Sequence, residues 1–177
     1  MKPDEVWLQT YTGVQFRPLD PQVEDVRIDD IAHALSNQCR FSGHCREFYS
    51  VADHSVWVSR IVPPEHALWG LLHDAGEAYL VDLPRPIKHG SEMGTIYREA
   101  ENRLMRAVCQ RFGLLSAEPT AIRAADQTML FTEQRDLMGR PPKAWRDPVE
   151  PLPMTLVPLA PKNAERAFLR RFAELTA

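Results

Sequence analysis

The feature that most constrains the fold of this chain is a His-Asp dipeptide, His73-Asp74, that directly follows an apolar run. The run, residues 67–72, reads Ala-Leu-Trp-Gly-Leu-Leu, which is typical of a buried segment. A buried imidazole beside a buried carboxylate is costly unless both groups have a partner. A divalent metal ion satisfies both at once, and nitrogen and oxygen donors suit zinc, manganese or cobalt. A core histidine followed by a surface aspartate is the alternative. The other residues of the chain are needed to choose between a metal site and this arrangement.

Apolar residues recur at helical spacing along most of the chain, which predicts an all-α protein. Asp29 and Asp30 are typical N-terminal capping residues for the first helix. Prolines and glycines mark several other ends, because proline is tolerated in a first turn and glycine favours a helix C-terminus. We expect helices at about residues 30–36, 50–62, 94–112, 119–138 and 164–175, with one more that starts at residue 65 and carries the His-Asp pair.

Four stretches do not fit a helix. Residues 7–16 alternate loosely around Thr12-Gly13 and could form a short β-hairpin. Residues 37–49 are polar and predict a loop. Two prolines interrupt residues 82–88, so we expect no regular helix there. Seven prolines lie between positions 141 and 161, which predicts an extended connector on the surface.

These elements predict a single domain over residues 1–177. The chain is long enough for one sizeable core and shows no internal repeat. We expect a compact helical bundle with its core at about residues 29–139. A proline-rich connector at residues 140–161 would then lead to a C-terminal helix at residues 162–177.

Composition excludes several other classes of protein. The net charge of −3 gives no global basic field, so we expect no nucleic-acid partner. The three cysteines, Cys39, Cys45 and Cys109, lack paired spacing, which argues against a thiolate zinc site or a disulfide framework. No stretch approaches the roughly 20 apolar residues of a membrane span, and the N-terminus has no apolar signal core. We therefore expect a cytoplasmic protein without a membrane partner.

Three helices with a buried face offer potential metal ligands. These ligands are His54, the pair His73-Asp74, and Asp126. Two imidazoles and two carboxylates can hold one divalent ion and leave positions open for a water and a substrate oxygen. Glu77 lies four residues after His73 and so shares its face of the expected helix.

The order of these residues resembles the HD-domain metal-dependent phosphohydrolases, in which a histidine, a His-Asp pair and an aspartate follow one another. The segment HDAGEAYLVDLPRPIK, residues 73–88, is closer still to the signature of small 5'-deoxynucleotidases and of related phage dATP triphosphohydrolases. The similarity covers roughly Ile31 to Leu137, and its polar positions recur in register across four segments. It implies an HD-domain helical bundle.

The resemblance assigns roles residue by residue. It places the metal ligands at His54, His73, Asp74 and Asp126. Glu77 falls on the glutamate that orients or deprotonates the attacking water, which agrees with its place one turn beyond a metal-binding histidine. Two-metal members of the superfamily have extra histidines before the last aspartate, where this chain has only His89. One divalent ion is therefore implied, zinc, cobalt or manganese.

The resemblance also implies substrate-binding residues. Arg40 and Phe41 match an arginine and an aromatic ring ahead of the first histidine, and the arginine acts in catalysis as well. Arginine suits phosphate through paired hydrogen bonds, and phenylalanine offers a stacking face to any base. The spacing from this pair to the first histidine can differ by a residue from that in relatives, which leaves the base preference open. Asp82 resembles a sugar-contacting aspartate and Lys88 a phosphate-contacting lysine, and Arg85 between them could assist.

The implied reaction is hydrolysis at the α-phosphorus of a 2'-deoxynucleotide. A monophosphate would give a deoxynucleoside and phosphate, and a triphosphate such as dATP would give a deoxynucleoside and triphosphate. The sequence does not choose between these substrates. The family also implies a homo-oligomer, a dimer or a hexamer.

Two alternatives stay open. One is a hydrolase of a signalling nucleotide, cyclic or guanosine polyphosphate, against which the signature at residues 82–88 argues. The other is a nucleotide-sensing module without catalysis, against which the presence of Glu77 argues.

Overall fold

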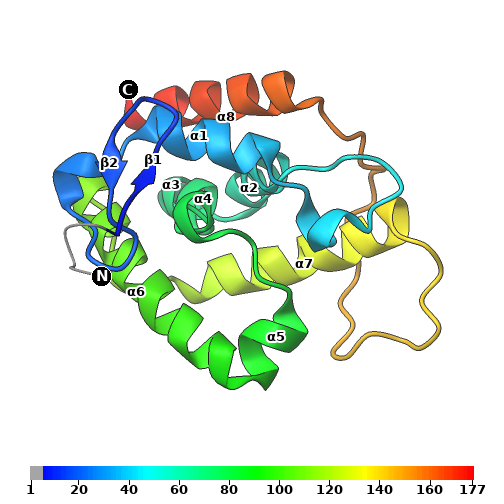
Figure 1. Ribbon diagram of the computed structural model, residues 1–177. Coiled ribbons are helices and arrows are strands. Elements are labelled where there is room, and N and C mark those ends of the chain that lie inside the picture. Colours follow the sequence, from blue (N-terminus) through cyan, green and yellow to red (C-terminus); the bar gives the residue numbers. More distant parts are fainter. Residues whose placement is uncertain (1–5) are drawn as a thin grey trace.

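Helix α2, Val51–Ile61, is the helix around which the others are arranged (Figure 1). In the computed structural model, which describes residues 6–177, α2 packs against four helices. They are α1 (Ile28–Asn37), α3 (Ala67–Leu72), α7 (Thr120–Leu137) and α8 (Pro161–Thr176). Every residue from position 51 to 59 except Trp57 is buried, so α2 has almost no solvent face. His54, which is fully buried, therefore lies in the interior.

The remaining elements are short, apart from one long helix. They are η2 (Val23–Asp25), η3 (Arg40–Gly43), η4 (Pro64–His66), α4 (Glu77–Leu80), α5 (Arg85–Gly90) and the long α6 (Glu92–Phe112). The expected hairpin is also present, since β1 (Leu8–Gln9) pairs antiparallel with β2 (Gln15–Phe16). The prediction of a mostly helical fold with a short N-terminal hairpin is confirmed.

The hydrophobic core has two groups of side chains, and α2 contributes to both. One group includes Leu35 of α1, Leu104 of α6 and Phe168 of α8, all fully buried. The other includes Ile122 and Met129 of α7. Residues in the N-terminal half of α2 join the first group, and Val58 joins the second together with Val62, the residue after the helix. The burial of both faces of α2 explains why its polar residues must find partners inside the protein.

A glycine allows α3 to lie close against α2. A Cβ atom at Gly70 would lie 3.1 Å from the Cα atom of Ser59 and 3.2 Å from a methyl group of Val62. Only a residue without a side chain fits at this distance without displacing the neighbouring backbone. This approach brings His73, the residue after α3, towards His54 on α2.

Two predictions near the His-Asp pair need correction. The helix that begins near residue 65 ends at Leu72, and residues 73–76 form turns before α4. The turn hydrogen bonds run between residues three apart, as from Ala75 N to Leu72 O and from Glu77 N to Asp74 O. Residues 85–90, expected to be irregular, form α5, because Pro86 occupies the first turn, where a helix needs no N–H donor.

The first helix also starts differently from the prediction. Its N-cap is Arg27, and Asp29 and Asp30 lie in the first turn rather than capping it. Asp30 instead accepts hydrogen bonds from the backbone N–H and the hydroxyl of Thr12, at 2.6 and 2.9 Å. The aspartate thus fastens the hairpin to α1. In the expected loop at residues 37–49, η3 is a single tight turn.

The connector between α7 and α8 contains no helix or strand, as predicted. Side chains of the bundle accept hydrogen bonds from the backbone N–H groups of this connector. Leu152 N donates to Thr132 Oγ1, Leu156 N to Asp136 Oδ2, and Leu159 N to Asp53 Oδ2, at 2.8–2.9 Å. These bonds replace the backbone pairs that proline cannot make, so the connector follows a fixed path to α8.

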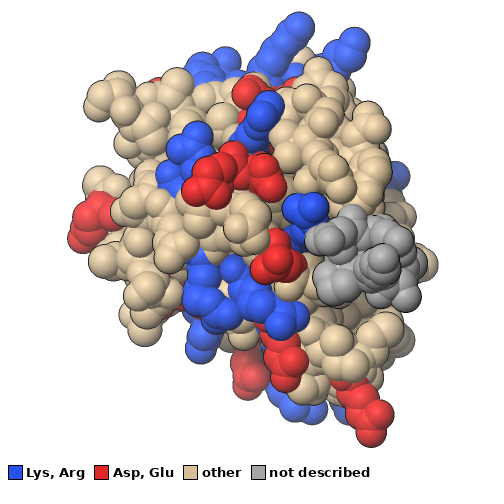
Figure 2. Space-filling model, turned by 60° about the vertical axis from the view of Figure 1, so that its left-hand side comes forward, with Lys and Arg blue, Asp and Glu red and all other residues tan. Residues whose placement is uncertain are grey.

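The surface shows no large field of one charge on the face seen in Figure 2, where acidic and basic side chains are interspersed. No helix within residues 6–177 is long and apolar enough to cross a membrane.

Candidate functional site

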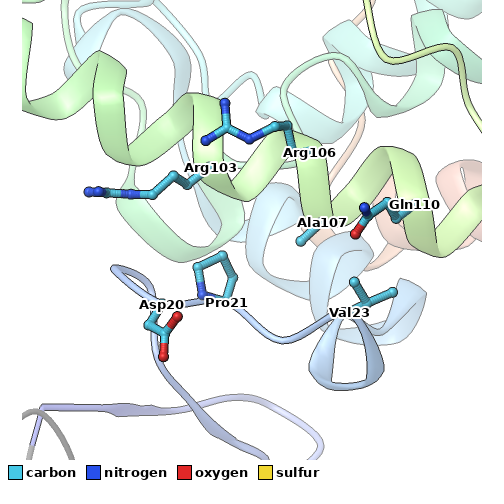
Figure 3. Close-up of a pocket in the computed structure, with 7 residues that line it drawn as sticks. All are labelled: Asp20, Pro21, Val23, Arg103, Arg106, Ala107 and Gln110. Atoms are coloured by element: carbon cyan, nitrogen blue, oxygen red, sulfur yellow. The ribbon is translucent and has the colours of Figure 1, made fainter.

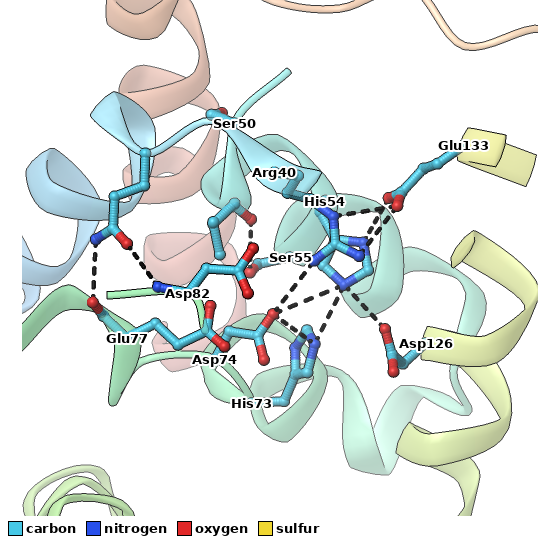
Figure 4. Close-up of polar contacts among 12 residues, drawn as sticks. Arg40, Ser50, His54, Ser55, His73, Asp74, Glu77, Asp82, Asp126 and Glu133 are labelled. Carbon is cyan, nitrogen blue, oxygen red and sulfur yellow. Dashed lines mark hydrogen bonds and ion pairs between the residues drawn. The ribbon is translucent and has the colours of Figure 1, made fainter. Parts of the chain in front are cut away.

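The predicted metal ligands come from α2, from the turn after α3 and from α7, which meet here (Figure 4). His54 Nε2 lies 3.3 Å from His73 Nε2, 3.8 Å from Asp74 Oδ2 and 3.3 Å from Asp126 Oδ1. His73 Nε2 lies 3.2 Å from Asp74 Oδ2. His54, His73 and Asp74 each offer one ligand atom within 4.8 Å of the others, and this group could hold a metal ion. Asp126 reaches the group through His54.

Both histidines are held with the same nitrogen facing this group. His54 Nδ1 donates to Glu133 Oε1 at 2.6 Å, and His73 Nδ1 donates to the backbone oxygen of Gly70 at 2.8 Å. With Nδ1 protonated in both rings, the two Nε2 atoms present lone pairs to each other and to two carboxylate oxygens. Four acceptors that converge in this way repel one another unless a cation lies among them. The donor set therefore fits a divalent metal ion with nitrogen and oxygen ligands.

Electrostatics at the group also favour positive charge. Burial and the charge of Arg40 lower the pKa of His54, but the carboxylates of Glu133 and Asp126 outweigh them and raise it to about 9. Without a metal ion, a proton on Nε2 would therefore take the place of the cation among these acceptors, and a bound metal would displace it. Burial raises the pKa of Asp74, yet His73, His54 and Arg40 together bring it far below its usual range. The pKa of Asp126 is lowered as well, because the hydrogen bond and charge of His54 outweigh the effect of burial. The carboxylates are thus anionic and ready to bind a cation.

Glu77 lies beside this group with one carboxylate oxygen unused. Its Oε1 is 3.8 Å from Lys88 Nζ, and its buried Oε2 has no hydrogen-bond partner among residues 6–177. Burial raises the pKa of Glu77 well above its usual value, and the charges of Asp74 and Asp82 add to the effect. An unpartnered buried carboxylate oxygen is costly, so Oε2 needs a donor such as a water. A raised pKa also suits a group that takes up a proton near neutral pH.

The side chain of Gln38 links Glu77 to Asp82 through their backbone atoms, a role that the sequence did not reveal. Its Nε2 donates to Glu77 O at 3.0 Å, and its Oε1 accepts from Asp82 N at 3.2 Å. Gln38 follows α1, far from the motif in sequence, so only the packing of α1 against α4 brings them together. The amide holds the turn that carries Asp82 next to Glu77.

Arg40 is buried beside the metal group rather than exposed in a loop. Its NH1 lies 3.7 Å from Asp74 Oδ2, and its Nε and NH2 lie 3.1 and 3.0 Å from Glu133 Oε2. Glu133 is fully buried and was not predicted as a site residue. Its position seven residues after Asp126, two turns along α7, is the sequence signal that could have revealed it.

Phe41 follows Arg40 in a strained turn. Phe41 and Ser42 both adopt left-handed backbone angles, with φ of 53° and 52°, which are uncommon outside glycine. The Phe41 ring lies 6.1 Å from the ring of Trp145 in the connector, and Arg40 lies over its face. Trp145 also lies edge-on to Phe131, so an aromatic cluster of three rings adjoins Arg40. Strained turns of this kind are often found at ligand-binding sites.

The other predicted substrate residues lie around the group but have protein partners. Lys88 Nζ is 2.6 Å from Glu101 Oε1, a partner that the sequence did not reveal. Arg85 pairs with Asp126 Oδ2 at 3.0 Å and is half exposed. Asp82 is held by Gln38 through its backbone, and burial raises the pKa of its carboxyl group. All three thus flank the metal group.

A separate surface hollow lies against α6. Its volume is about 260 Å³, and it lies between residues 20–23 and the outer face of α6 (Figure 3). Its lining contains Arg103 and Arg106 but none of the predicted site residues. The hollow is therefore distinct from the metal group.

Comparison with known proteins gives two relatives, one of them matched over nearly the full length of the chain. The chain is 38% identical over 174 residues to the uncharacterized protein YfdR of Escherichia coli K12, and the match covers 96% of both chains. It is 35% identical over 146 residues to the uncharacterized protein RCAP_rcc00048 of Rhodobacter capsulatus, covering 75% of this chain and 74% of the relative. No protein-family model matches the chain.

Proposed function

This chain belongs to the same family as YfdR of Escherichia coli, and we propose that it is a metal-dependent phosphohydrolase of 2'-deoxynucleotides. The observation that carries the proposal is the convergence of His54 Nε2, His73 Nε2 and Asp74 Oδ2, with Asp126 Oδ1 beside His54. Both histidines have their other ring nitrogen tied to an acceptor, as metal-binding histidines do. The resemblance of residues 73–88 to small 5'-deoxynucleotidases adds the substrate class.

Glu77 would act on the attacking water. A bound divalent ion, zinc, cobalt or manganese, would supply Lewis acidity to the water and to a phosphoryl oxygen. The unpartnered Oε2 of Glu77 is free to accept a hydrogen bond from that water, and the raised pKa of the carboxyl group favours proton uptake. Water attack at the α-phosphorus breaks the bond to the 5'-oxygen of the deoxynucleoside. The proton taken from the water would go to Glu77 and from there to the departing 5'-oxygen, which leaves as the hydroxyl group of the deoxynucleoside.

Arg40 and Lys88 would bind the phosphate. Arg40 NH1 is the guanidinium nitrogen closest to Asp74 and so faces the metal group, while Nε and NH2 are held by Glu133. Lys88 Nζ lies near Glu77, 3.8 Å from its Oε1 atom. Two cations that flank the phosphoryl group offset the negative charge that grows on its oxygens during the reaction.

Base and sugar would be bound by neighbouring side chains. The ring of Phe41, with Trp145 beside it, offers an aromatic surface for stacking of a base. Asp82, which lies between Glu77 and Lys88 in the sequence, would contact the sugar. We expect the protein to act in the cytoplasm on free deoxynucleotides, as a homo-oligomer.

The proposal is tested by incubating the metal-loaded protein with every deoxynucleoside mono- and triphosphate and separating the products by chromatography. Hydrolysis at the α-phosphorus gives deoxynucleoside with phosphate or with triphosphate. Ribonucleotides, a cyclic dinucleotide and a guanosine polyphosphate serve as matched controls. Turnover of a signalling nucleotide but of no deoxynucleotide would replace the proposed substrate class, and an absence of any hydrolysis would favour a sensing module.

A further inference from the structure

A carboxylate outside the assigned site lies between two of its residues. Glu133 of α7 is fully buried and has both carboxylate oxygens engaged. Oε1 accepts from His54 Nδ1 at 2.6 Å, and Oε2 accepts from Arg40 Nε at 3.1 Å and lies 3.0 Å from Arg40 NH2 (Figure 4). A buried carboxylate is costly unless each oxygen has a donor, and here every donor belongs to a residue of the site.

We propose that Glu133 is a positioning residue that fixes a metal ligand with one oxygen and the phosphate-binding arginine with the other. The inference rests on the proposed function, because it takes His54 as a metal ligand and Arg40 as a phosphate ligand. It adds a physical link between the two, so that one side chain sets the geometry of both binding steps.

The contact with His54 selects the form of the imidazole that can bind a metal. Because a carboxylate only accepts, the hydrogen of the ring must sit on Nδ1, which leaves the lone pair of Nε2 directed at His73 and Asp74. Without an acceptor at Nδ1, the hydrogen could move to Nε2 and the ring could turn. Loss of such a partner typically lowers metal affinity by about 10–100-fold.

The contact with Arg40 leaves one nitrogen for a ligand. Nε and NH2 are taken by Glu133, so NH1 is the part of the guanidinium that remains directed towards Asp74. The negative charge of Glu133 also offsets the positive charge of Arg40, which would otherwise repel a cation held by Asp74. Arg40 can therefore lie close to a metal group without weakening it.

The test uses Glu133→Gln in the full chain. A carboxamide has only one acceptor oxygen, so it can serve His54 or Arg40 but not both. Glu133→Asp keeps both acceptors on a shorter side chain and should partly restore function. Asp53→Asn is the matched control, because Asp53 is a carboxylate on α2 that is only 1% exposed and accepts from Leu159 N, which an amide oxygen can also do.

Two calorimetric titrations on each protein give the readout. The first adds Mn²⁺ to metal-free protein, and the second adds inorganic phosphate to the metal-loaded protein. We expect Glu133→Gln to weaken Mn²⁺ binding by about 10–100-fold, and phosphate binding several-fold. Glu133→Asp should bind both probes more tightly than Glu133→Gln but less tightly than the wild type. Asp53→Asn should match the wild type in both titrations.

Unchanged binding of either probe in Glu133→Gln, or an equal loss in Asp53→Asn, overturns the proposal. If Glu133→Gln does not fold by circular dichroism, Glu133→Asp carries the test, with weakened binding of both probes expected. Neither titration needs turnover, so a failure of the proposed enzyme activity would be seen separately from a failure of this inference.

Discussion

Glu77 is the residue whose removal should separate chemistry from binding. Its side chain has no hydrogen bond to a metal ligand, and its free oxygen is the acceptor that we assign to the attacking water. Glu77→Gln should therefore keep metal and substrate binding but lower the turnover number by about 10²–10⁴-fold, the usual contribution of a positioned acid–base group. Steady-state kinetics with a deoxynucleotide, together with metal analysis, would measure this.

Glu101→Gln is the control, because Glu101 shares Lys88 with Glu77 but has hydrogen bonds to no other site residue. It should lower turnover much less. Equal losses in the two variants would show that the lysine pair, rather than the water, explains the role of Glu77.

Arg40 and Phe41 are adjacent, but the site gives them different roles. Arg40→Ala should lower turnover for every nucleotide alike, because the charge that it offsets grows in the transition state. Phe41→Ala should mainly raise the Michaelis constant, more for purines than for pyrimidines, since stacking is worth about 1–3 kcal/mol per base. Kinetics on a set of deoxynucleotides would distinguish the two. An identical base-dependent profile for both variants would contradict this division.

Some residues of the site could be predicted from the sequence, and others could not. His54, His73 and Asp74 could be predicted because their chemistry and spacing are visible along the chain, and the structure brings them together. Gln38 could not, because Glu77 and Asp82, its partners, lie far away in sequence. Glu133 was missed although it lies two turns after Asp126 on α7, because its partners His54 and Arg40 are also distant in sequence. A glutamate or glutamine on a helix face is usually solvated, and only packing against a distant element gives it a buried role.

At the scale of elements, the segment between α4 and α5 holds a backbone conformation that costs free energy. Val81 ends α4 with φ of 77° and ψ of 151°, a region that is nearly restricted to glycine. Its carbonyl oxygen accepts from Tyr97 of α6, which holds the turn in place. The turn directs the chain from Glu77 to Asp82, so the strain is located where the site requires a sharp reversal.

Val81→Gly should relieve this strain. Because the relief exceeds the entropy cost of glycine, we expect the free energy of unfolding to rise by about 1 kcal/mol. Val157→Gly is the control, since Val157 is exposed and lies outside the left-handed region, and it should destabilise the protein. Urea unfolding measures both. Destabilisation by Val81→Gly equal to that by Val157→Gly would show that Val81 is unstrained.

Helix ends were predictable where proline or glycine sets them, and less so elsewhere. Pro63 and Pro64 follow α2, and Gly113 caps α6 in the left-handed conformation, as expected. The end of α3 at Leu72 has no such residue, because His73 follows it with right-handed helical angles and the chain continues through hydrogen-bonded turns. The helix α5 was missed because a proline was taken as an interruption, although in a first turn it is tolerated.

At the scale of the whole molecule, α8 completes the core that supports the site. The connector carries the chain to α8, which packs against α1, α2 and α3 and inserts the fully buried ring of Phe168. The site is thus built on α2, and α2 depends on a helix that lies about 100 residues later in the chain.

Phe168→Ala should lower the free energy of unfolding by about 3–5 kcal/mol, the usual cost of removing a buried aromatic ring. Circular dichroism and tryptophan fluorescence should report one shared transition, because the two core groups meet at α2. The control, Leu115→Ala, removes an exposed side chain and should change stability by less than about 0.5 kcal/mol. Two separate transitions would contradict a single cooperative unit.

The most direct test of the account is reconstitution of the metal-free protein with measured amounts of Mn²⁺ while the release of deoxynucleoside from deoxynucleotides is followed. If His54, His73, Asp74 and Asp126 hold one catalytic ion, release should rise in proportion to added metal and level off at about one ion per chain. His73→Ala should show no such rise. Deoxynucleoside release that is independent of metal, or that His73→Ala retains, would contradict the account.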